Sequence, residues 1–131
     1  MGTGNENYSK LVLIVDDDDN LLFNLGAFLE NQGFRTITAR GVKEGLDAFF
    51  GKRIDAALVD YRLVGQRGTE FVWEVRRRIP GFPIVMMTAY LDEWVEVMIK
   101  RYAPLECLTK PFKSEDLLRA LKKALHGQPE R

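Results

Sequence analysis

The sequence predicts an α/β fold: a doubly wound (βα)5 domain with a five-stranded parallel sheet and helices on both faces. Short apolar runs of strand length alternate along the chain with segments whose apolar residues repeat at helical spacing. Strict alternation of this kind is typical of a parallel sheet that is covered on both sides. The length of 131 residues corresponds to about one domain.

Five segments are expected to be strands, and their composition indicates their place in the sheet. The most continuous apolar runs are expected at the centre, because a central parallel strand is buried on both faces. These runs are residues 11–15, 56–59 and 84–87. Two more mixed runs, residues 34–39 and 105–109, are expected at the edges of the sheet.

Five segments carry apolar residues on one helical face and are expected to be helices. They are residues 21–29, 42–50, 71–79, 91–102 and 117–125. Asp19 or Asn20 can cap the first of them, and Gly33 can end it. Ser114 is the expected cap of the last helix.

Composition limits the classes of function. Nineteen basic and nineteen acidic residues give a net charge of zero, which argues against direct binding of nucleic acid. One cysteine, Cys107, allows neither an internal disulfide nor a cysteine-based zinc site, and it suits a reducing compartment such as the cytoplasm. No apolar run approaches the roughly 20 residues that a membrane span needs. We expect the domain over residues 10–126, after a disordered segment or leader at 1–9 and before a tail or linker at 127–131.

Polar residues stand where four of the expected strands end. Residues 16–19 are all aspartate, and Asp60, Thr88 and Lys110 follow later strands. Because ligands of such sheets bind at the carboxyl ends of the strands, these side chains are expected to meet there. Clustered carboxylates repel one another, and Mg²⁺, which prefers oxygen ligands, removes the repulsion. With a lysine added, the pocket suits a phosphoryl group.

Taken singly, each of these residues has an ordinary structural explanation. An aspartate after a strand often caps the next helix, as we expect of Asp19, and a lone lysine is usually solvated. The coincidence of matching chemistry at successive strand ends favours a functional site.

At this point the chain resembles the receiver domains of two-component response regulators. The resemblance covers about residues 10–125 and rests on four segments. They are LVLIVDD at 11–17, ALVDYRLVG at 57–65, MMTA at 86–89 and LTKPF at 108–112. It implies a chemotaxis-regulator-like fold with the flavodoxin-like strand order 2-1-3-4-5.

The resemblance implies a role for each residue at the strand ends. Asp60 would be the phosphoacceptor, taking a phosphoryl group from a sensor histidine kinase or a phosphotransfer protein. Asp16 and Asp17 would hold Mg²⁺ together with Asp60 and the backbone carbonyl of Arg62. Lys110 would pair with a phosphoryl oxygen. The domain would catalyse only its own phosphorylation and dephosphorylation, so it would not be an enzyme in the usual sense.

The resemblance also implies a conformational switch, with one departure from the family pattern. The hydroxyl of Thr88 would turn to the phosphoryl group, and an aromatic residue three positions before the lysine usually accompanies this movement. Here that position is Cys107, so the chain either lacks the aromatic half of the switch or supplies it from Tyr102 or Tyr90. The simplest interpretation of Cys107 itself is a buried inert thiol. The Lys110–Pro111 bond resembles a site where the family has a cis peptide.

The implied partners are a kinase and an output, either an attached domain or a downstream effector, as in regulation of transcription. A homodimer through the fourth helix, fifth strand and fifth helix is plausible, because Val97 lies off the buried stripe of the fourth helix. Neither a membrane nor direct contact with nucleic acid is expected.

Three alternatives stay open. A haloacid-dehalogenase-like phosphatase would use Asp16-x-Asp18 with Thr88 and Lys110, although no later acidic pair follows a strand. A flavodoxin-like or dinucleotide-binding module is the second alternative, although no Gly-x-Gly-x-x-Gly motif follows a strand. A receiver could also serve as a docking module that works without phosphorylation.

Two other features concern the surface. Trp94 fits a core stripe, whereas Trp73 falls off the stripe of its helix and is expected to be partly exposed. The run of arginines at 76–78 is most simply a solvated helix face, given the zero net charge.

Overall fold

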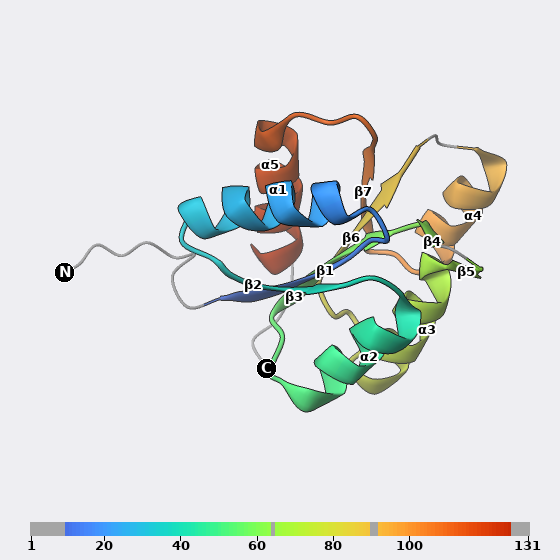
Figure 1. Cartoon of the computed structure of the whole chain (residues 1–131). Helices are drawn as coiled ribbons and strands as arrows, with labels where there is room; N and C mark the ends of the chain where they lie inside the picture. Colours follow the sequence, from blue (N-terminus) through green and yellow to red (C-terminus); the bar gives the residue numbers. More distant parts are fainter. Residues whose placement is uncertain (1–9, 64, 90–91, 127–131) are drawn as a thin grey trace.

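The computed structural model describes residues 10–63, 65–89 and 92–126. A parallel five-stranded sheet with the order β2-β1-β3-β6-β7 lies between two layers of helices (Figure 1). Its strands are β1 Leu11–Val15, β2 Arg35–Ala39, β3 Ala56–Asp60, β6 Ile84–Thr88 and β7 Glu106–Thr109. The helices are α1 Asp19–Asn31, α2 Val42–Gly51, α3 Gly68–Arg78, α4 Glu93–Arg101 and α5 Ser114–His126. The predicted fold class, the alternation and the strand order are confirmed.

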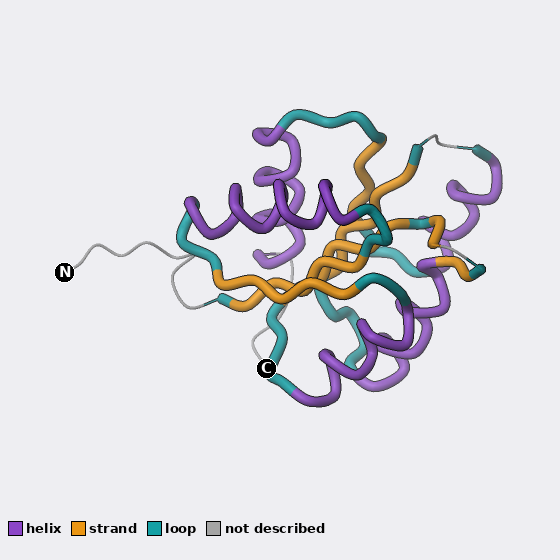
Figure 2. The backbone as a smooth tube through the Cα atoms, in the orientation of Figure 1, coloured by secondary structure: helices purple, strands orange, loops and turns teal. Residues whose placement is uncertain are grey.

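The strands alternate their side chains between two apolar cores. Along β1, Leu11, Leu13 and Val15 face the core shared with α2, α3 and α4, whereas Val12 and Ile14 face the core shared with α1 and α5. Figure 2 shows the strands as a single twisted layer between the helices. This two-residue period is why a central strand is apolar at every position.

The start of α1 differs by one residue from the prediction. Asp18 has an extended backbone, and its carboxylate accepts hydrogen bonds from the backbone nitrogens of Asn20 and Leu21, so Asp18 is the N-cap. Asp19 is the first helical residue and forms an ion pair with Arg40.

The start of α5 also differs, whereas the end of α1 is as expected. The Leu117 nitrogen donates to the Lys113 carbonyl, which places Ser114 inside the first turn of α5 rather than at its cap. Gly33 follows α1 with φ of 98°, a left-handed conformation that glycine adopts without strain.

A small antiparallel ribbon follows the third strand of the main sheet. It pairs β4, Arg62–Leu63, with β5, Gln66–Arg67. The side-chain oxygen of Gln66 accepts a hydrogen bond from the Val42 nitrogen, which ties the ribbon to the start of α2. Strands of two residues carry no apolar pattern, so the sequence does not predict them.

The tryptophan prediction is half wrong. Trp73 is 50% exposed, as expected, but Trp94 is 68% exposed instead of buried. Among the described residues of α4 only Val95 is buried, while Met98 and Ile99 pack against the same core and stay partly exposed. None of the described helices has the length and apolar character that a bilayer crossing needs.

Arg76 is not part of a solvated face. Its guanidinium donates to the Phe82 carbonyl at 3.0 and 3.1 Å, to the Pro104 carbonyl at 2.7 Å and to the Tyr102 carbonyl. Burial lowers the pKa of Arg76 from its ordinary value. The side chain thus joins the end of α3 to the end of α4 and to the segment before β6.

Replacing Arg76 with methionine is expected to lower the free energy of unfolding by about 2–3 kcal/mol, because backbone carbonyls lose a charged donor. Arg77→Met is the matched control: this exposed neighbour forms an ion pair with Glu74, at 2.8 Å, and lies 4.9 Å from the centre of the Trp73 ring. Because both contacts are on the surface, the change in stability is expected to stay below about 1 kcal/mol. Urea unfolding followed by circular dichroism measures both values. Equal effects would contradict the anchoring role of Arg76.

Candidate functional site

The register of the sheet brings the polar strand ends together. Val15 is the partner of Val59, so Asp16 and Asp60 occupy equivalent positions on adjacent strands. In the next pair of strands, β3 and β6, Asp60 is opposite Met87, one residue before Thr88. Neighbouring strands are about 4.8 Å apart, which puts these side chains within reach of one another.

Three carboxylates form a cluster at the carboxyl ends of the strands. One oxygen from each of Asp16, Asp17 and Asp60 lies within 4.8 Å of the others. Asp16 is fully buried, and Asp60 is 8% exposed. The Asp18 nitrogen donates to Asp16 Oδ1 at 2.9 Å, which orients that carboxylate.

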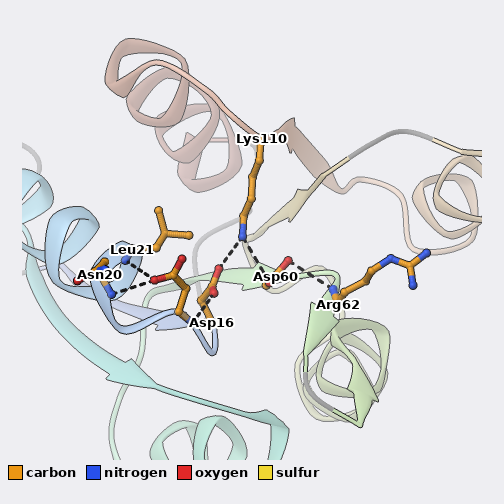
Figure 3. A network of polar contacts seen from close by, with 7 residues as sticks. Asp16, Asn20, Leu21, Asp60, Arg62 and Lys110 are labelled. Atoms are coloured by element: carbon orange, nitrogen blue, oxygen red, sulfur yellow. Dashed lines mark hydrogen bonds and ion pairs between the residues drawn. The ribbon is translucent and has the colours of Figure 1, made fainter.

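Lys110 supplies the positive charge that faces the cluster. Its Nζ lies 2.9 Å from Asp16 Oδ2 and 3.4 Å from Asp60 Oδ2, between the two carboxylates (Figure 3). Burial alone would lower the pKa of Lys110, but its hydrogen bond to Asp16 and the charges of Asp60 and Asp16 outweigh burial and raise it. Lys110 is therefore held as an ammonium.

Asp60 keeps an unusually high proton affinity despite this ammonium. Burial, followed by the negative charge of Asp16, raises the pKa of Asp60 to about 6, against the opposing effects of Lys110 and of the hydrogen bond from the Arg62 nitrogen. That hydrogen bond reaches Asp60 Oδ1 at 3.4 Å. The site therefore carries more negative charge than Lys110 alone neutralises.

The backbone carbonyl of Arg62 points away from the hydrogen bonds that join β4 to β5. The Gly68 nitrogen donates to the Tyr61 carbonyl, and the nitrogens of Arg62 and Arg67 donate to carboxylates of Asp60 and Glu70. Arg62 and Arg67 are thus a non-hydrogen-bonded pair of the ribbon. The Arg62 side chain extends away from Asp60 (Figure 3).

Thr88 lies on β6, the strand next to that of Asp60, and Cys107 lies on β7, one strand farther away. Thr88 is buried at the end of β6, and its carbonyl accepts a hydrogen bond from the Lys110 nitrogen at 2.6 Å. Cys107 is half-buried on β7, packs against the core shared with α2, α3 and α4, and has a thiol pKa raised by burial. The Lys110–Pro111 bond is cis, and so is Ala103–Pro104, which the sequence analysis did not anticipate.

The donor set suits a hard divalent cation. Three carboxylates face one ammonium, and oxygen is the ligand that Mg²⁺ prefers. A cation at Asp16, Asp17 and Asp60 would offset the remaining negative charge.

Of the four consecutive aspartates, only two belong to this cluster. Asp18 is exposed and caps α1, and Asp19 pairs with Arg40 at 3.1 Å. The Asp-x-Asp arrangement of a dehalogenase-like phosphatase is therefore absent from the cluster that the described residues form.

Gly68 is a site residue that the sequence analysis missed. A Cβ built at this position would lie 2.2 Å from the Asp60 carbonyl oxygen, so the start of α3 approaches the backbone of Asp60 as only glycine allows. The only signal in the sequence is a glycine just before the third expected helix, which is weak by itself.

The family model described as the response regulator receiver domain matches residues 12–122. The chain belongs to this family. It is 31% identical over 114 residues to the transcriptional regulatory protein GlrR of Escherichia coli, covering 87% of this chain and 26% of that protein. The chain thus spans about a quarter of the length of this relative.

Solved receiver structures agree with the fold. The receiver domain protein (CheY-like) of Methanospirillum hungatei superimposes with a TM-score of 0.84 at 30% identity, covering 91% of this chain and 95% of that one. The response regulator TrrA of Thermotoga maritima, in complex with Mg²⁺-BeF, gives 0.79 at 28% identity, covering 88% and 99%. The chain is therefore a receiver domain of two-component signalling proteins rather than a conventional enzyme.

The raised pKa of Asp60 predicts a pH-dependent loss of stability in the presence of a chelator. Asp60 binds its proton more tightly in the folded chain, at a pKa of about 6, than in the unfolded chain, at 3.8. The folded state of the wild type therefore loses stability as pH rises through this range. In Asp60→Asn no group at this position titrates, so this loss is absent. Between about pH 4 and about pH 8, the wild type should lose about 2 kcal/mol relative to Asp60→Asn.

Urea unfolding across this pH range measures the difference. Asp47→Asn is the control, because Asp47 is exposed and forms an ion pair with Lys43 on the surface of α2. Parallel pH curves for wild type and Asp60→Asn would show that Asp60 does not titrate as described.

Proposed function

We propose that this receiver domain accepts a phosphoryl group on Asp60 from the phosphohistidine of a sensor histidine kinase or a phosphotransfer protein. The observation that carries the proposal is the position of Asp60. Its carboxylate lies at a strand end beside Asp16 and Asp17, with Lys110 Nζ 3.4 Å from one of its oxygens. A nucleophile facing a cation and a metal-binding carboxylate set is the arrangement that phosphoryl transfer needs.

The reaction is an in-line displacement at phosphorus. One Asp60 oxygen forms the new P–O bond while the P–N bond of the phosphohistidine breaks, and the histidine nitrogen leaves with the electron pair. The product is an acyl phosphate on Asp60, which water later hydrolyses to restore the carboxylate. The ionised form of Asp60 is the nucleophile, so Lys110 assists by favouring that form.

The carboxylates of Asp16, Asp17 and Asp60, with the carbonyl of Arg62, would hold Mg²⁺. When bound, Mg²⁺ would supply positive charge to the oxygens of the transferring group. Lys110 would shift from the Asp16–Asp60 pair to an oxygen of the phosphoryl group, keeping a charge-assisted contact in both states.

The output is a shift between conformations. The phosphoryl dianion gives the active state contacts that the inactive state lacks, and the buried Thr88 hydroxyl is the group we assign to sense it. Cys107 has no aromatic ring to move, so we assign the switch to Thr88 and the segment that follows it.

The proposed partners follow from the family. A kinase or phosphotransfer protein supplies the phosphoryl group, and an output domain or effector reads it. By analogy with GlrR, a transcriptional regulatory protein, this output is the regulation of transcription. The surface of α4, β7 and α5, where Val97 is 45% exposed, is the proposed contact in a homodimer. A cytoplasmic location belongs to the same proposal.

The test is intact mass spectrometry after incubation with acetyl phosphate, with and without Mg²⁺, for wild type and Asp60→Asn. We expect one phosphoryl group on the wild type in the presence of Mg²⁺ and none on Asp60→Asn. No adduct on a folded wild type would favour a docking module that works without phosphorylation. Continuous turnover of a generic phosphate ester, without a stoichiometric adduct, would favour a phosphatase.

A further inference from the structure

A basic hollow lies at the end of the molecule opposite Asp60, apart from the proposed phosphorylation site. α2 and α3 both end there, and Figure 1 shows the end of α2 beside the start of β3. We call it the α2–α3 hollow, with a volume of about 310 Å³. It is lined by Phe49, Phe50, Lys52, Arg53, Ile54, Arg78 and Ile79.

Three cations line this hollow without a carboxylate. Lys52, Arg53 and Arg78 are all exposed, and no described acidic residue lies within ion-pair distance of them or lines the hollow. On the same helices, Lys43 and Arg77 are each paired with an acidic neighbour. The hollow is thus a local excess of positive charge on a chain whose net charge is zero.

An apolar surface accompanies these cations. Phe50 is 49% exposed, with its ring edge-to-face on the buried Phe49, and the Arg78 guanidinium lies 4.7 Å from the centre of the Phe50 ring. Cations near a helix C-terminus stabilise the helix dipole, which accounts for the charges but not for an exposed aromatic ring. Arginine and aromatic side chains together are enriched at protein interfaces.

We propose that the α2–α3 hollow binds an acidic protein segment that carries an apolar side chain. Its carboxylates would pair with Lys52, Arg53 and Arg78, and its apolar side chain would cover Phe50 and Ile79. Arg78 is already stacked on Phe50, so less side-chain freedom is lost on binding.

The observations favour a protein over a nucleic acid. Stacking of bases needs an open aromatic face, but Arg78 lies over Phe50 and Phe49 contacts the same ring. A phosphate backbone also offers no apolar group to cover Phe50 and Ile79. Asp60 lies at the carboxyl end of β3, whereas the hollow lies near the start of that strand, so binding should not depend on phosphorylation of Asp60. The hollow would bind its partner in both the phosphorylated and the unphosphorylated domain.

The experiment titrates a fluorescein-labelled peptide of alternating glutamate and leucine into the full chain and follows fluorescence anisotropy. Lys52→Glu, Arg53→Glu and Arg78→Glu are combined in one variant. The matched control reverses three exposed cations elsewhere, Lys100, Arg101 and Lys113, so that both variants have the same net charge. We expect the hollow variant to lose at least about tenfold in affinity, and the control to stay close to wild type.

A second pair of variants tests the apolar part without changing charge. Phe50→Ala is expected to weaken binding, whereas Phe23→Ala, on α1 and 75% exposed, is not. Backbone amide signals of residues 49–54 should shift in ¹⁵N NMR spectra on titration, while the indole signal of Trp94 stays in place. Thermal melting and phosphorylation by acetyl phosphate verify that each variant is folded.

Three outcomes would overturn the proposal. They are the absence of saturable peptide binding by the wild type at low salt, equal losses in the two triple variants, and tighter binding of an oligothymidylate than of the peptide. None of them bears on Asp60, so the proposed phosphoryl transfer would stand or fall separately.

Discussion

Replacing Lys110 with methionine should slow phosphorylation of Asp60 by acetyl phosphate by about 10²–10³-fold, the usual cost of removing one charge-stabilising donor. Among the described residues, Lys110 is the one ammonium within ion-pair distance of Asp60. Without it, the transferring group loses a positive contact. The pKa of Asp60 also loses an influence that lowers it, so less of the nucleophile is ionised.

The rate is measured by intact mass at a series of times with saturating Mg²⁺. Lys113→Met is the matched control, because Lys113 is an exposed lysine three positions along the chain, and its rate should equal that of wild type. Unfolding by urea shows whether the Lys110 variant is folded. A folded Lys110 variant that reacts as fast as wild type would remove Lys110 from the mechanism, while leaving Asp60 as the acceptor.

The largest effect on stability is expected from Gly68→Ala, which should cost about 3 kcal/mol or more, at the upper end for an overpacked position. The new methyl group would lie 2.2 Å from the Asp60 carbonyl oxygen and 2.9 Å from a methyl carbon of Val59. Gly68 cannot retreat easily, because its nitrogen donates to the Tyr61 carbonyl at 2.7 Å. Either the hydrogen bond or the backbone of Asp60 must move.

Gly51→Ala is the matched control, since nothing lies within 4 Å of a Cβ built there at the end of α2. Its effect should stay within about 0.5 kcal/mol. Urea unfolding measures both variants, and the rate of phosphorylation reports any displacement of Asp60. Equal stabilities would mean that the backbone near Asp60 yields freely to a methyl group.

The sequence was sufficient for the fold and for the approximate place of the site. Apolar runs of strand length and apolar stripes of helical period decide which face of each element is buried, and their alternation implies a parallel sheet. The carboxyl ends of parallel strands share one edge, so the clustering of Asp16, Asp60 and Lys110 could be expected from the order of elements alone. Both expectations depend only on local periodicity and chain order.

Other features depend on where single atoms lie. Which of four adjacent aspartates caps α1 and which face Lys110 is decided by backbone angles at Asp18, and the sequence pattern favours none of them. Trp94 looked like a core residue because helical periodicity does not tell how far a short helix extends beyond its sheet.

Arg76 and Gly68 show most clearly that contacts between distant residues do not follow from a local sequence pattern. Arg76 is anchored by carbonyls six to twenty-eight positions away, and Gly68 is needed because the backbone of Asp60 passes beside it. The sequence by itself determined the sheet, its two cores and the edge where the polar strand ends meet. Only the tertiary structure decided the hydrogen bonds and close contacts at that edge and at the α2–α3 hollow, because these join residues that are distant in the chain.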